Sequence, residues 1–174
     1  PIRCRAYPIP YKMQEVIDKE IESMLTMGVI ERSEAPYASP LVLVKKTDGT
    51  YRVCVNFKPL NTVTVFDPEP MMSPDEIFPK LAGSNFYSTF DFSKGYWAIP
   101  MEEKSKDYTS FITSRGLMGF KVMPFGMVNA GSTYNRMVRK LLKGAQNLEN
   151  YVDDVLGHTK TWEHHVQILS SRLL

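Results

Sequence analysis

Apolar residues recur at helical spacing in several parts of the chain. Over residues 11–27 they alternate with charged side chains, and Gly28 follows as a C-terminal stop, which predicts an amphipathic surface helix. A second stripe of this kind covers residues 132–143, where Gly144 ends it. A last helix is predicted from Thr161 onward. The residues expected to face inward from it are Trp162, Val166, Leu169 and Leu173.

Between these helices the pattern is that of strands and hairpins. Residues 41–46 and 51–56 are β-type runs, and the Asp-Gly pair between them is a strong signal for a tight hairpin. The further predicted strands are residues 85–92, 108–113, 117–123, 148–152 and 155–159. Residues 73–76 combine an N-cap Ser, a Pro and an acid three positions on, which predicts the start of a short helix. This order favours an α+β fold with a largely antiparallel sheet.

Composition narrows the classes that remain. The 174 residues are 43% hydrophobic and 23% charged, which is typical of a globular domain, and 21 basic against 19 acidic side chains leave a net charge of +2. Dedicated nucleic-acid binders are usually more basic, although opposed acidic and basic patches can also sum to near zero. Cys4 and Cys54 form no CxxC pair, so we expect neither a disulfide framework nor a zinc site, and a reducing compartment is favoured.

The start of the chain and its apolar runs bear on localisation. No apolar run approaches the roughly 20 residues of a membrane helix. The start, Pro1 to Cys4, has neither an initiator Met nor a signal-peptide pattern. Membrane and secreted classes are therefore disfavoured, and we expect the chain to be a piece of a longer protein.

Three carboxylates stand in apolar surroundings. Asp91 falls in the strand-type run 86–92, where burial of a charged group costs several kcal/mol unless it is compensated. Asp153 and Asp154 interrupt a second apolar stretch, and only a turn would bring both side chains near one point. Carboxylates without His or Cys nearby suit Mg²⁺ and phosphoryl transfer by two metal ions. A solvated turn and an end-of-strand acid explain the spacing equally well.

Longer motifs decide between these interpretations. Residues 90–96 (Phe-Asp-Phe-Ser-Lys-Gly-Tyr), 123–130 (Met-Pro-Phe-Gly-Met-Val-Asn-Ala) and 151–154 (Tyr-Val-Asp-Asp) resemble, in order and spacing, the three palm motifs of reverse transcriptases. Stretches upstream resemble the fingers of the polymerase of gypsy-type long-terminal-repeat retrotransposons, relatives of retroviral enzymes. These stretches are Val29 to Ser33, Ser39-Pro40, Val44 to Lys46, Asp48-Gly49, Arg52 and Leu60-Asn61. The resemblance covers essentially the whole chain.

The resemblance implies the fingers and palm of a right-hand polymerase. The palm would be a ferredoxin-like antiparallel sheet with helices on one face. Residues 1–84 would be mainly fingers with a palm-associated N-terminal portion, and residues 85–174 mainly palm, with fingers strands inserted near 108–123. The thumb, the connection and the ribonuclease H domain of such polymerases would lie outside these residues, so we expect the chain alone to bind primer and template weakly.

Site roles follow from the same resemblance. Asp91 and Asp153 would hold two Mg²⁺ ions, with Mn²⁺ as a substitute, and Asp154 would complete the acidic cluster. Tyr96 would lie beneath the sugar of the incoming nucleotide and select deoxynucleotides. Arg52 and one of Lys45 or Lys46 would reach the triphosphate, a choice that the sequence leaves open. Phe125 and Gly126 would line the nucleotide pocket. The nucleic-acid contacts would come from Asn61, Arg136, Arg139, Lys140 and Lys143.

The activity implied is RNA-directed DNA polymerisation, in which a primer 3′-hydroxyl attacks the α-phosphate of a dNTP on an RNA or DNA template. The implied partners are the template-primer, dNTPs and the rest of a Pol polyprotein that serves transposition: thumb, ribonuclease H and integrase. Localisation would be intracellular, in a cytoplasmic element particle or the nucleus, with no membrane partner.

Some positions depart from the family pattern. Gly131 stands in place of Pro, Asn56 in place of Asp, and Gly157 in place of a bulkier apolar residue that would strengthen the strand. The departures keep open a catalytically decayed copy that acts as a nucleic-acid or protein binding module. A nucleotide cyclase or an RNA-templated RNA polymerase on a palm-like fold is a second alternative. The histidines, His158, His164 and His165, are expected at the surface rather than at a metal.

Overall fold

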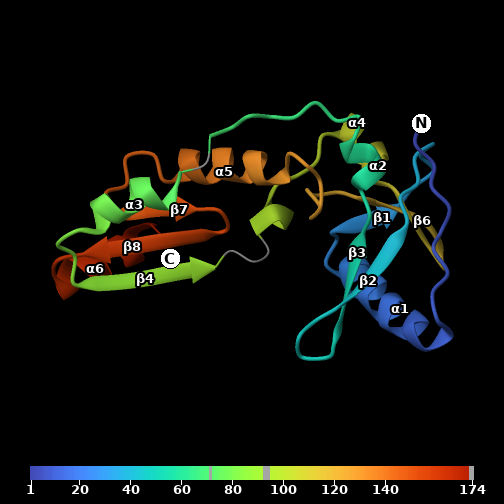
Figure 1. The fold of residues 1–174 in the computed structure, drawn as a ribbon, viewed down its shortest axis with the longest axis horizontal. Helices are drawn as coiled ribbons and strands as arrows, with labels where there is room; N and C mark the ends of the chain where they lie inside the picture. The colour runs from blue at the N-terminus through green and yellow to red at the C-terminus, as the bar shows by residue number, and fades with distance from the viewer. Residues whose placement is uncertain (71, 92–94, 173–174) are drawn as a thin grey trace. The chain divides into compact units, whose positions relative to one another are not determined.

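The computed structural model describes residues 1–70, 72–91 and 95–172. Positions 92–94 of the first motif and Leu173 of the last helix therefore lie outside the described residues. The elements, drawn in Figure 1, are α1 (Tyr11–Thr26), β1 (Ile30–Arg32), β2 (Leu41–Lys45), β3 (Tyr51–Val55), α2 (Lys58–Asn61), α3 (Pro74–Leu81), β4 (Phe86–Asp91), the 3-10 helix η1 (Gly95–Ala98), α4 (Glu103–Lys106), the 3-10 helix η2 (Asp107–Thr109), β5 (Phe111–Thr113), β6 (Gly116–Phe120), α5 (Ala130–Leu141), β7 (Leu148–Tyr151), β8 (Asp154–Thr159) and α6 (Trp162–Arg172).

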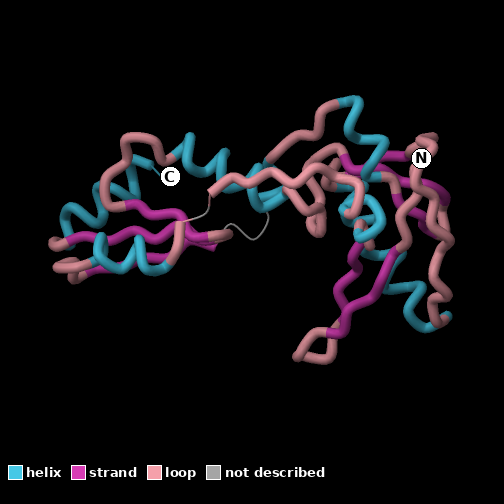
Figure 2. Tube along the Cα trace, turned by 45° about the horizontal axis from the view of Figure 1, so that its top comes forward, coloured by secondary structure: helices cyan, strands magenta, loops and turns pink. Residues whose placement is uncertain are grey.

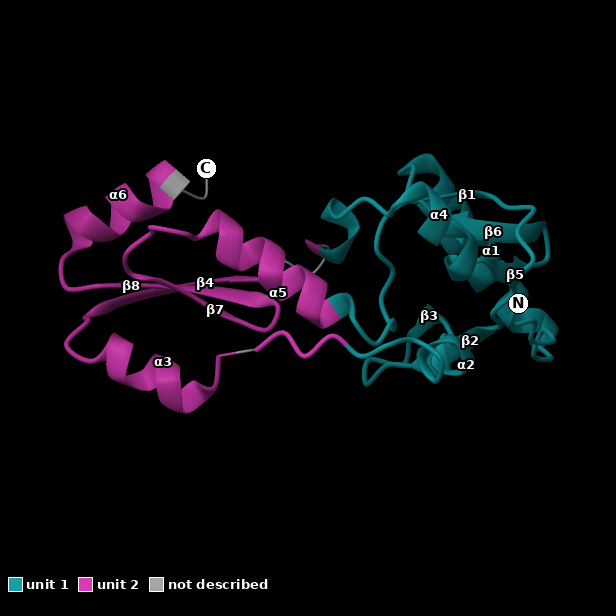
Figure 3. Ribbon diagram, turned by 90° about the horizontal axis from the view of Figure 1, so that it is seen from above, with its two compact units in different colours: residues 1–66, 96–130 teal, residues 67–95, 131–174 magenta. Residues whose placement is uncertain are grey.

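The chain forms two compact units, coloured separately in Figure 3. Unit 1 comprises residues 1–66 and 96–130, and unit 2 comprises residues 67–95 and 131–174. The boundary expected between residues 84 and 85 falls within unit 2, and the assignment of fingers and palm stays a prediction. The physical reason is that α3 and the segment before it belong with α5 and the β4 sheet, whereas β5 and β6 pair with β1.

Unit 1 contains a three-stranded antiparallel sheet and a separate hairpin. The sheet has the order β1-β6-β5, and the hairpin joins β2 to β3, as the Asp-Gly pair predicts. Figure 2 shows the hairpin with its projecting loop. The apolar side of α1, with Ile17 and Ile21, packs into a core with Phe111 and Phe120. The predicted strand 108–113 is shorter than expected, because residues 107–109 form η2 and β5 begins only at Phe111. From η2 the Thr109 hydroxyl accepts a hydrogen bond from the backbone N–H of Phe120 at 2.9 Å.

Unit 2 is built on the antiparallel sheet β4-β8-β7. In the chain α5 lies between β4 and β7, and α6 follows β8, which gives the β-α-β-β-α series of a ferredoxin-like sheet. Figure 1 shows the three strands side by side with α5 along them. The register runs from Phe86 opposite Thr159 to Asp91 opposite Asp154. The α+β fold with antiparallel sheets is thus confirmed, and α3 begins with the predicted capping box at Ser73.

The last helix is rotated relative to the prediction. Trp162 and Val166, expected inside, are 58% and 45% exposed, whereas His165 is only 2% exposed. Its ring fits the core because Nε2 lies 2.8 Å from the Ser88 hydroxyl and Nδ1 lies 3.1 Å from the Thr159 hydroxyl. A buried imidazole with both nitrogens hydrogen-bonded avoids the cost of an unsatisfied polar group. The surface position expected for His165 is therefore wrong.

His158 also departs from its expected surface position, since it is 5% exposed, while His164 is exposed as predicted. The Nδ1 atom of His158 lies 3.0 Å from the Ser84 hydroxyl. Burial lowers the pKa of His158, which favours the neutral form of the ring in the fold. Among the residues that the structure describes, no helix is long and apolar enough to cross a membrane.

We expect the free energy of unfolding to decrease as the pH falls below about 6.5, the ordinary pKa of histidine. The pKa of folded His158 is lowered by burial and by Lys80, and partly restored by Glu149, 4.0 Å from Nε2. The unfolded chain therefore binds the proton first, and stability present above pH ~6.5 is lost toward the lower, folded pKa. Urea unfolding at two pH values on either side of 6.5 should show His158→Gln with a weaker pH dependence than wild type. His164→Gln should keep the wild-type dependence; an unchanged slope in both variants would contradict the assignment.

Candidate active site

Two of the three predicted carboxylates lie directly opposite each other at the end of the sheet of unit 2. Asp91 is the last residue of β4 and Asp154 the first of β8, and the two are register partners. Residues opposite each other in an antiparallel pair project from the same face with Cβ atoms about 4.5–5.5 Å apart. Asp153 precedes Asp154 in the turn that joins β7 to β8. Asp91 and Asp153 are 62 positions apart in the sequence, and the structure brings them to the same end of the sheet.

Asp91 is not buried, contrary to the argument from its apolar neighbours. Exposure alternates along β4, and Asp91 is an exposed residue at its end. Because this carboxylate stays in contact with solvent, it needs no partner to offset a cost of burial. The electrostatic cost comes instead from like charges opposite each other across the strands, which a bound cation would relieve.

The donor set is suited to a hard cation, since carboxylate oxygens are the ligands that Mg²⁺ prefers. Within the described ranges, no group of three or more His, Cys, Asp or Glu side chains is arranged to hold a metal ion. The three carboxylates share one end of the sheet without converging as a closed ligand cage. The fit to Mg²⁺ therefore rests on the type of donor, carboxylate oxygen, and not on a closed set of ligands.

The turn between β7 and β8 is strained. Tyr151 and Asp154 are register partners, which leaves Val152 and Asp153 as a two-residue loop. Val152 has a φ of 53°, in the left-handed region that β-branched residues rarely adopt. Such a conformation costs about 1–3 kcal/mol and persists only when its surroundings impose it. Here the pairing on both sides of the turn imposes it and places Asp153 immediately before β8.

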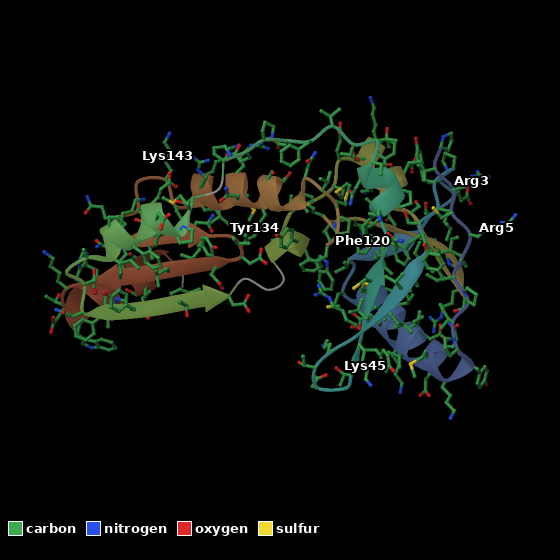
Figure 4. All side chains as sticks on the ribbon, in the orientation of Figure 1. Arg3, Arg5, Lys45, Phe120, Tyr134 and Lys143 are labelled. Carbon is green, nitrogen blue, oxygen red and sulfur yellow. The ribbon has the colours of Figure 1, made fainter. Side chains whose placement is uncertain are left out.

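Tyr134, a residue of α5, lies against this acidic hairpin. The sequence predicts it only as part of the apolar face of a helix and does not identify it as a site residue. It is 1% exposed, and Figure 4 shows its side chain on the sheet side of α5. The pKa of Tyr134 is raised by burial and by the negative charges of Asp153, Asp154 and Asp91, in that order. The hydroxyl therefore stays protonated. A Cβ at Gly95 would lie 2.5 Å from Tyr134 Cε2, so Tyr134 leaves room only for glycine there.

Unit 1 brings together a second set of predicted residues around the ring of Phe125. The guanidinium carbon of Arg52 lies 5.3 Å from the Phe125 centroid, and the ring of Tyr96 lies 4.9 Å from it. Trp97 completes the aromatic cluster at 6.0 Å. A cation over an aromatic face contributes about 0.5–1 kcal/mol at an exposed site, so Phe125 holds the Arg52 head group in place.

The hairpin register separates the two lysines that the sequence leaves equivalent. Val44 pairs with Arg52, and Lys45 pairs with Tyr51. Side chains alternate between faces along a strand, so Lys45 projects from the face opposite to Arg52. Lys46 continues the pairing, because its N–H donates to the Thr50 carbonyl at 2.8 Å. Its position in the alternation places it on the Arg52 face.

Asn61 holds the loop that carries Phe125. Its amide Nδ2 donates to the Gly126 carbonyl at 2.8 Å, and its Oδ1 accepts from the Val128 N–H at 2.9 Å. Gly126 itself has a φ of 89°, which favours glycine. The nucleic-acid contact expected for Asn61 stays a prediction, but the observed role of its amide is to fix this loop.

The departures from the family pattern are accommodated. Gly157 does not interrupt β8, and a Cβ there would lie 3.4 Å from Leu148 Cδ2, so the packing is close. The Asn56 amide accepts from the Lys58 N–H at 3.0 Å. α5 begins at Ala130 with Gly131 inside its first turn. Of the four cations predicted to contact nucleic acid from α5, Arg136 and Arg139 form ion pairs within unit 2.

These features define a class. A ferredoxin-like sheet with acids at the strand ends, in a chain that also presents a cationic hairpin, is typical of metal-dependent nucleotidyltransferases with a palm domain. A family model described as reverse transcriptase (RNA-dependent DNA polymerase) matches residues 44–173. The chain belongs to this reverse transcriptase family.

Relatives among curated proteins are retroelement polyproteins. The Pol polyprotein from transposon 297 of Drosophila melanogaster is 32% identical over 183 residues, which cover 99% of this chain and 17% of the relative. That from transposon gypsy of the same species is 32% identical over 181 residues, 99% of this chain and 18% of the relative. The chain therefore spans less than a fifth of these relatives. The resemblance to gypsy-type elements is confirmed.

Solved structures agree. The native protease-reverse transcriptase of prototype foamy virus has a TM-score of 0.87 and 24% identity, covering 99% of this chain and 24% of that one. The foamy viral protease-reverse transcriptase in complex with an RNA/DNA hybrid has a TM-score of 0.89 and 26% identity, covering 98% of this chain and 23% of that one. The predicted polymerase fold is thereby confirmed.

Replacement of Val152 by glycine should stabilise the fold. Glycine adopts a positive φ without strain, so the gain is about 1 kcal/mol after the entropy cost of glycine is subtracted from the strain released. Urea unfolding measures it. Val63→Gly, at an exposed loop residue without a positive φ, serves as the control and should be destabilising or neutral. A decrease in stability for Val152→Gly equal to that of the control would show that the turn is unstrained.

Proposed function

We propose that this chain is the catalytic part of an RNA-directed DNA polymerase of a retrotransposon, which transfers nucleotides from dNTPs to a primer 3′-hydroxyl on an RNA or DNA template. The observation that carries the proposal is the register of β4 and β8, which sets Asp91 opposite Asp154 beside the turn with Asp153. Membership in the reverse transcriptase family supports it. The foamy viral relatives described in complex with an RNA/DNA hybrid and with double-stranded DNA support the proposed partners.

Asp91 and Asp153 are proposed to hold two Mg²⁺ ions, or Mn²⁺ in their place, with Asp154 completing the acidic set. Such ions, when bound, activate the attacking hydroxyl and stabilise the charge on the phosphate and the leaving group. The protein's own contribution is to hold the carboxylates. The strained turn fixes Asp153, and Tyr134, whose pKa is raised by burial and by the three acids, stays protonated and adds no negative charge to them.

Nucleotide binding is proposed for the Phe125 cluster of unit 1. Arg52, held over the Phe125 ring, and Lys46, on the same face of the hairpin, would contact the triphosphate. We assign this role to Lys46 rather than Lys45 because Lys45 projects from the other face. Tyr96, packed on Phe125, would lie beneath the sugar, and Gly126 would line the pocket.

The proposal extends to the setting of the chain. The relatives are parts of Pol polyproteins, so the remaining partners would be the thumb, ribonuclease H and integrase of the same polyprotein, in a transposition cycle inside the cell. The near-neutral charge fits this function, because acid at the proposed metal site offsets base on the hairpin and on α5.

Asp153→Asn should abolish Mg²⁺-dependent dNTP incorporation on a primed RNA template, measured in the context of the longer polyprotein. Loss of a residue that supports a metal ligand costs about 10–100-fold in metal affinity or activity. Loss of the ligand itself costs more, so we expect incorporation to fall by more than ~100-fold. Asp75→Asn, at an exposed acid of α3 outside the three motifs, is the control and should retain activity. Equal incorporation by wild type and Asp153→Asn would refute the metal assignment. Hybrid binding without incorporation by wild type would favour the decayed binding module.

Lys46→Ala should raise the KM for dNTP about 10–100-fold, the effect of losing a charge-assisted hydrogen bond. Lys45→Ala is the matched control, since it removes the same charge one position away and should change the KM little. Steady-state incorporation with varied dNTP measures both. A larger effect for Lys45→Ala than for Lys46→Ala would reverse the assignment based on the hairpin register.

A further inference from the structure

One face of α5 is occupied by the segment that precedes α3. Four polar residues of the helix share the spacing i, i+3, i+4, i+7, which places them on a single face. They are Ser132, Asn135, Arg136 and Arg139. All four contact residues 67–70, here called the acidic strap. Figure 3 shows the strap running beside α5 within unit 2.

The contacts are dense and mostly ionic. Arg136 Nη2 lies 2.6 Å from Asp67 Oδ2, and its Nε donates to Glu69 Oε2 at 3.2 Å. Arg139 Nη1 donates to Glu69 Oε1 at 2.7 Å. The side chains of Asp67 and Glu69 are 28% and 17% exposed, and those of Arg136 and Arg139 are 40% and 52% exposed, so the pairs are shielded from solvent mainly on the side of the acids. A network of this kind is stronger than an isolated surface pair.

Backbone groups of the strap are held as well. The Ser132 hydroxyl donates to the Asp67 carbonyl at 3.0 Å, and the Asn135 amide donates to the Pro70 carbonyl at 3.0 Å. Residues 67–70 have no helix or strand of their own. Ordering an irregular segment costs backbone entropy, so its position depends on these side chains.

Asn135 links the strap to the strand that leads into the acidic hairpin. Its Oδ1 accepts a hydrogen bond from the amide of Asn150, and both residues are buried. Asn150 lies in β7, one residue before Tyr151 and the turn with Asp153. The same amide group therefore contacts the strap on one side and β7 on the other.

Lys140 and Lys143 differ from the two arginines. Both are exposed, and within the described residues neither takes part in an ion pair with the strap. Lys143 lies two residues beyond the end of α5, and Figure 4 shows it extending away from the ribbon. Their charge is available to an anionic partner, whereas that of Arg136 and Arg139 is neutralised by Asp67 and Glu69.

We infer that Arg136 and Arg139 are positioning residues that hold the acidic strap and, through Asn135, the strand before the acidic hairpin, and that the phosphate contacts of α5 come from Lys140 and Lys143. The second half rests on the proposed function, because it requires a nucleic-acid partner. The first half rests on contacts within unit 2 alone.

Salt dependence of RNA/DNA hybrid binding separates the two kinds of cation. Each lost phosphate contact reduces the slope of log K against log salt by about 1. The double variant Lys140→Ala, Lys143→Ala should reduce the slope by about 2 and leave the urea midpoint unchanged. The double variant Arg136→Gln, Arg139→Gln should lower the urea midpoint and keep the slope. A slope reduced by about 2 in the arginine variant, with an unchanged midpoint, would overturn the inference.

The strap acids provide the matched control. Asp67→Asn with Glu69→Gln breaks the same ion pairs with the opposite change in charge, and should lower the urea midpoint as the arginine variant does. The quadruple variant should lose less than the sum of the two doubles, because interacting residues are not additive. If the stability losses of the two double variants simply add, the four charged residues do not interact as one network. If the double arginine variant does not fold, the salt slope is measured on Arg139→Gln alone, a variant that keeps the ion pairs of Arg136.

Polymerase kinetics distinguish positioning from a merely structural role. The variant Asp67→Asn, Glu69→Gln should lower kcat about tenfold or more at unchanged KM for the hybrid, since small misplacements of reacting groups cost up to about 100-fold. The lysine variant should raise that KM at unchanged kcat. The reverse pattern would overturn the inference. Absence of incorporation by wild type would refute the proposed function alone, because the binding slopes and unfolding midpoints still test the roles of the arginines.

Discussion

The pairing of β4 with β8 is the constraint on which unit 2 depends. It sets Asp91 opposite Asp154, an arrangement that like-charge repulsion disfavours. The register must therefore be imposed by the rest of the strands, because a shift of one residue would turn every side chain to the other face. At the far end Phe86 pairs with Thr159, and His165 joins Ser88 of β4 to Thr159 of β8 through its two ring nitrogens. The acids lie opposite each other because apolar packing and buried hydrogen bonds elsewhere stabilise that register.

Polar groups inside unit 2 serve this purpose repeatedly. His165 bridges two strands, and the amide pair of Asn135 and Asn150 joins α5 to β7. Tyr134 packs on Gly95 so closely that no side chain fits there. The hydrogen bonds of His165 and of the two asparagines are directional, so each specifies one arrangement of helix and strand where apolar contact alone would tolerate several. Their common effect is to hold the elements that carry the acidic hairpin.

Unit 1 uses different means to arrange its own set of residues. The hairpin register assigns Arg52 and Lys46 to one face, and the Asn61 amide fixes the loop that presents Phe125. The charge of the whole chain is consistent with this organisation. Acids at the hairpin of unit 2 and in the acidic strap are among the 19 acidic side chains that nearly balance 21 basic ones, which include the cations of the β2–β3 hairpin and of α5. A small net charge thus reflects local pairing and separated patches, not a lack of charged surface.

The sequence by itself determined the family and those helices and turns whose formation depends on residues close together in the chain. Helical periodicity predicted α1 and α5, the Asp-Gly pair predicted the β2–β3 hairpin, and Ser73 predicted the capping box of α3. These signals are local, because turn geometry and capping involve residues a few positions apart. Only the tertiary structure decided that Asp91 is exposed, that His158 and His165 are buried, and that Arg136 and Arg139 bind the acidic strap. The two histidines and the two arginines each have a partner 67 or more positions away in the chain, such as Glu69 for Arg136 and Ser88 for His165. No local pattern encodes which distant residue will supply the hydrogen bond or the opposite charge.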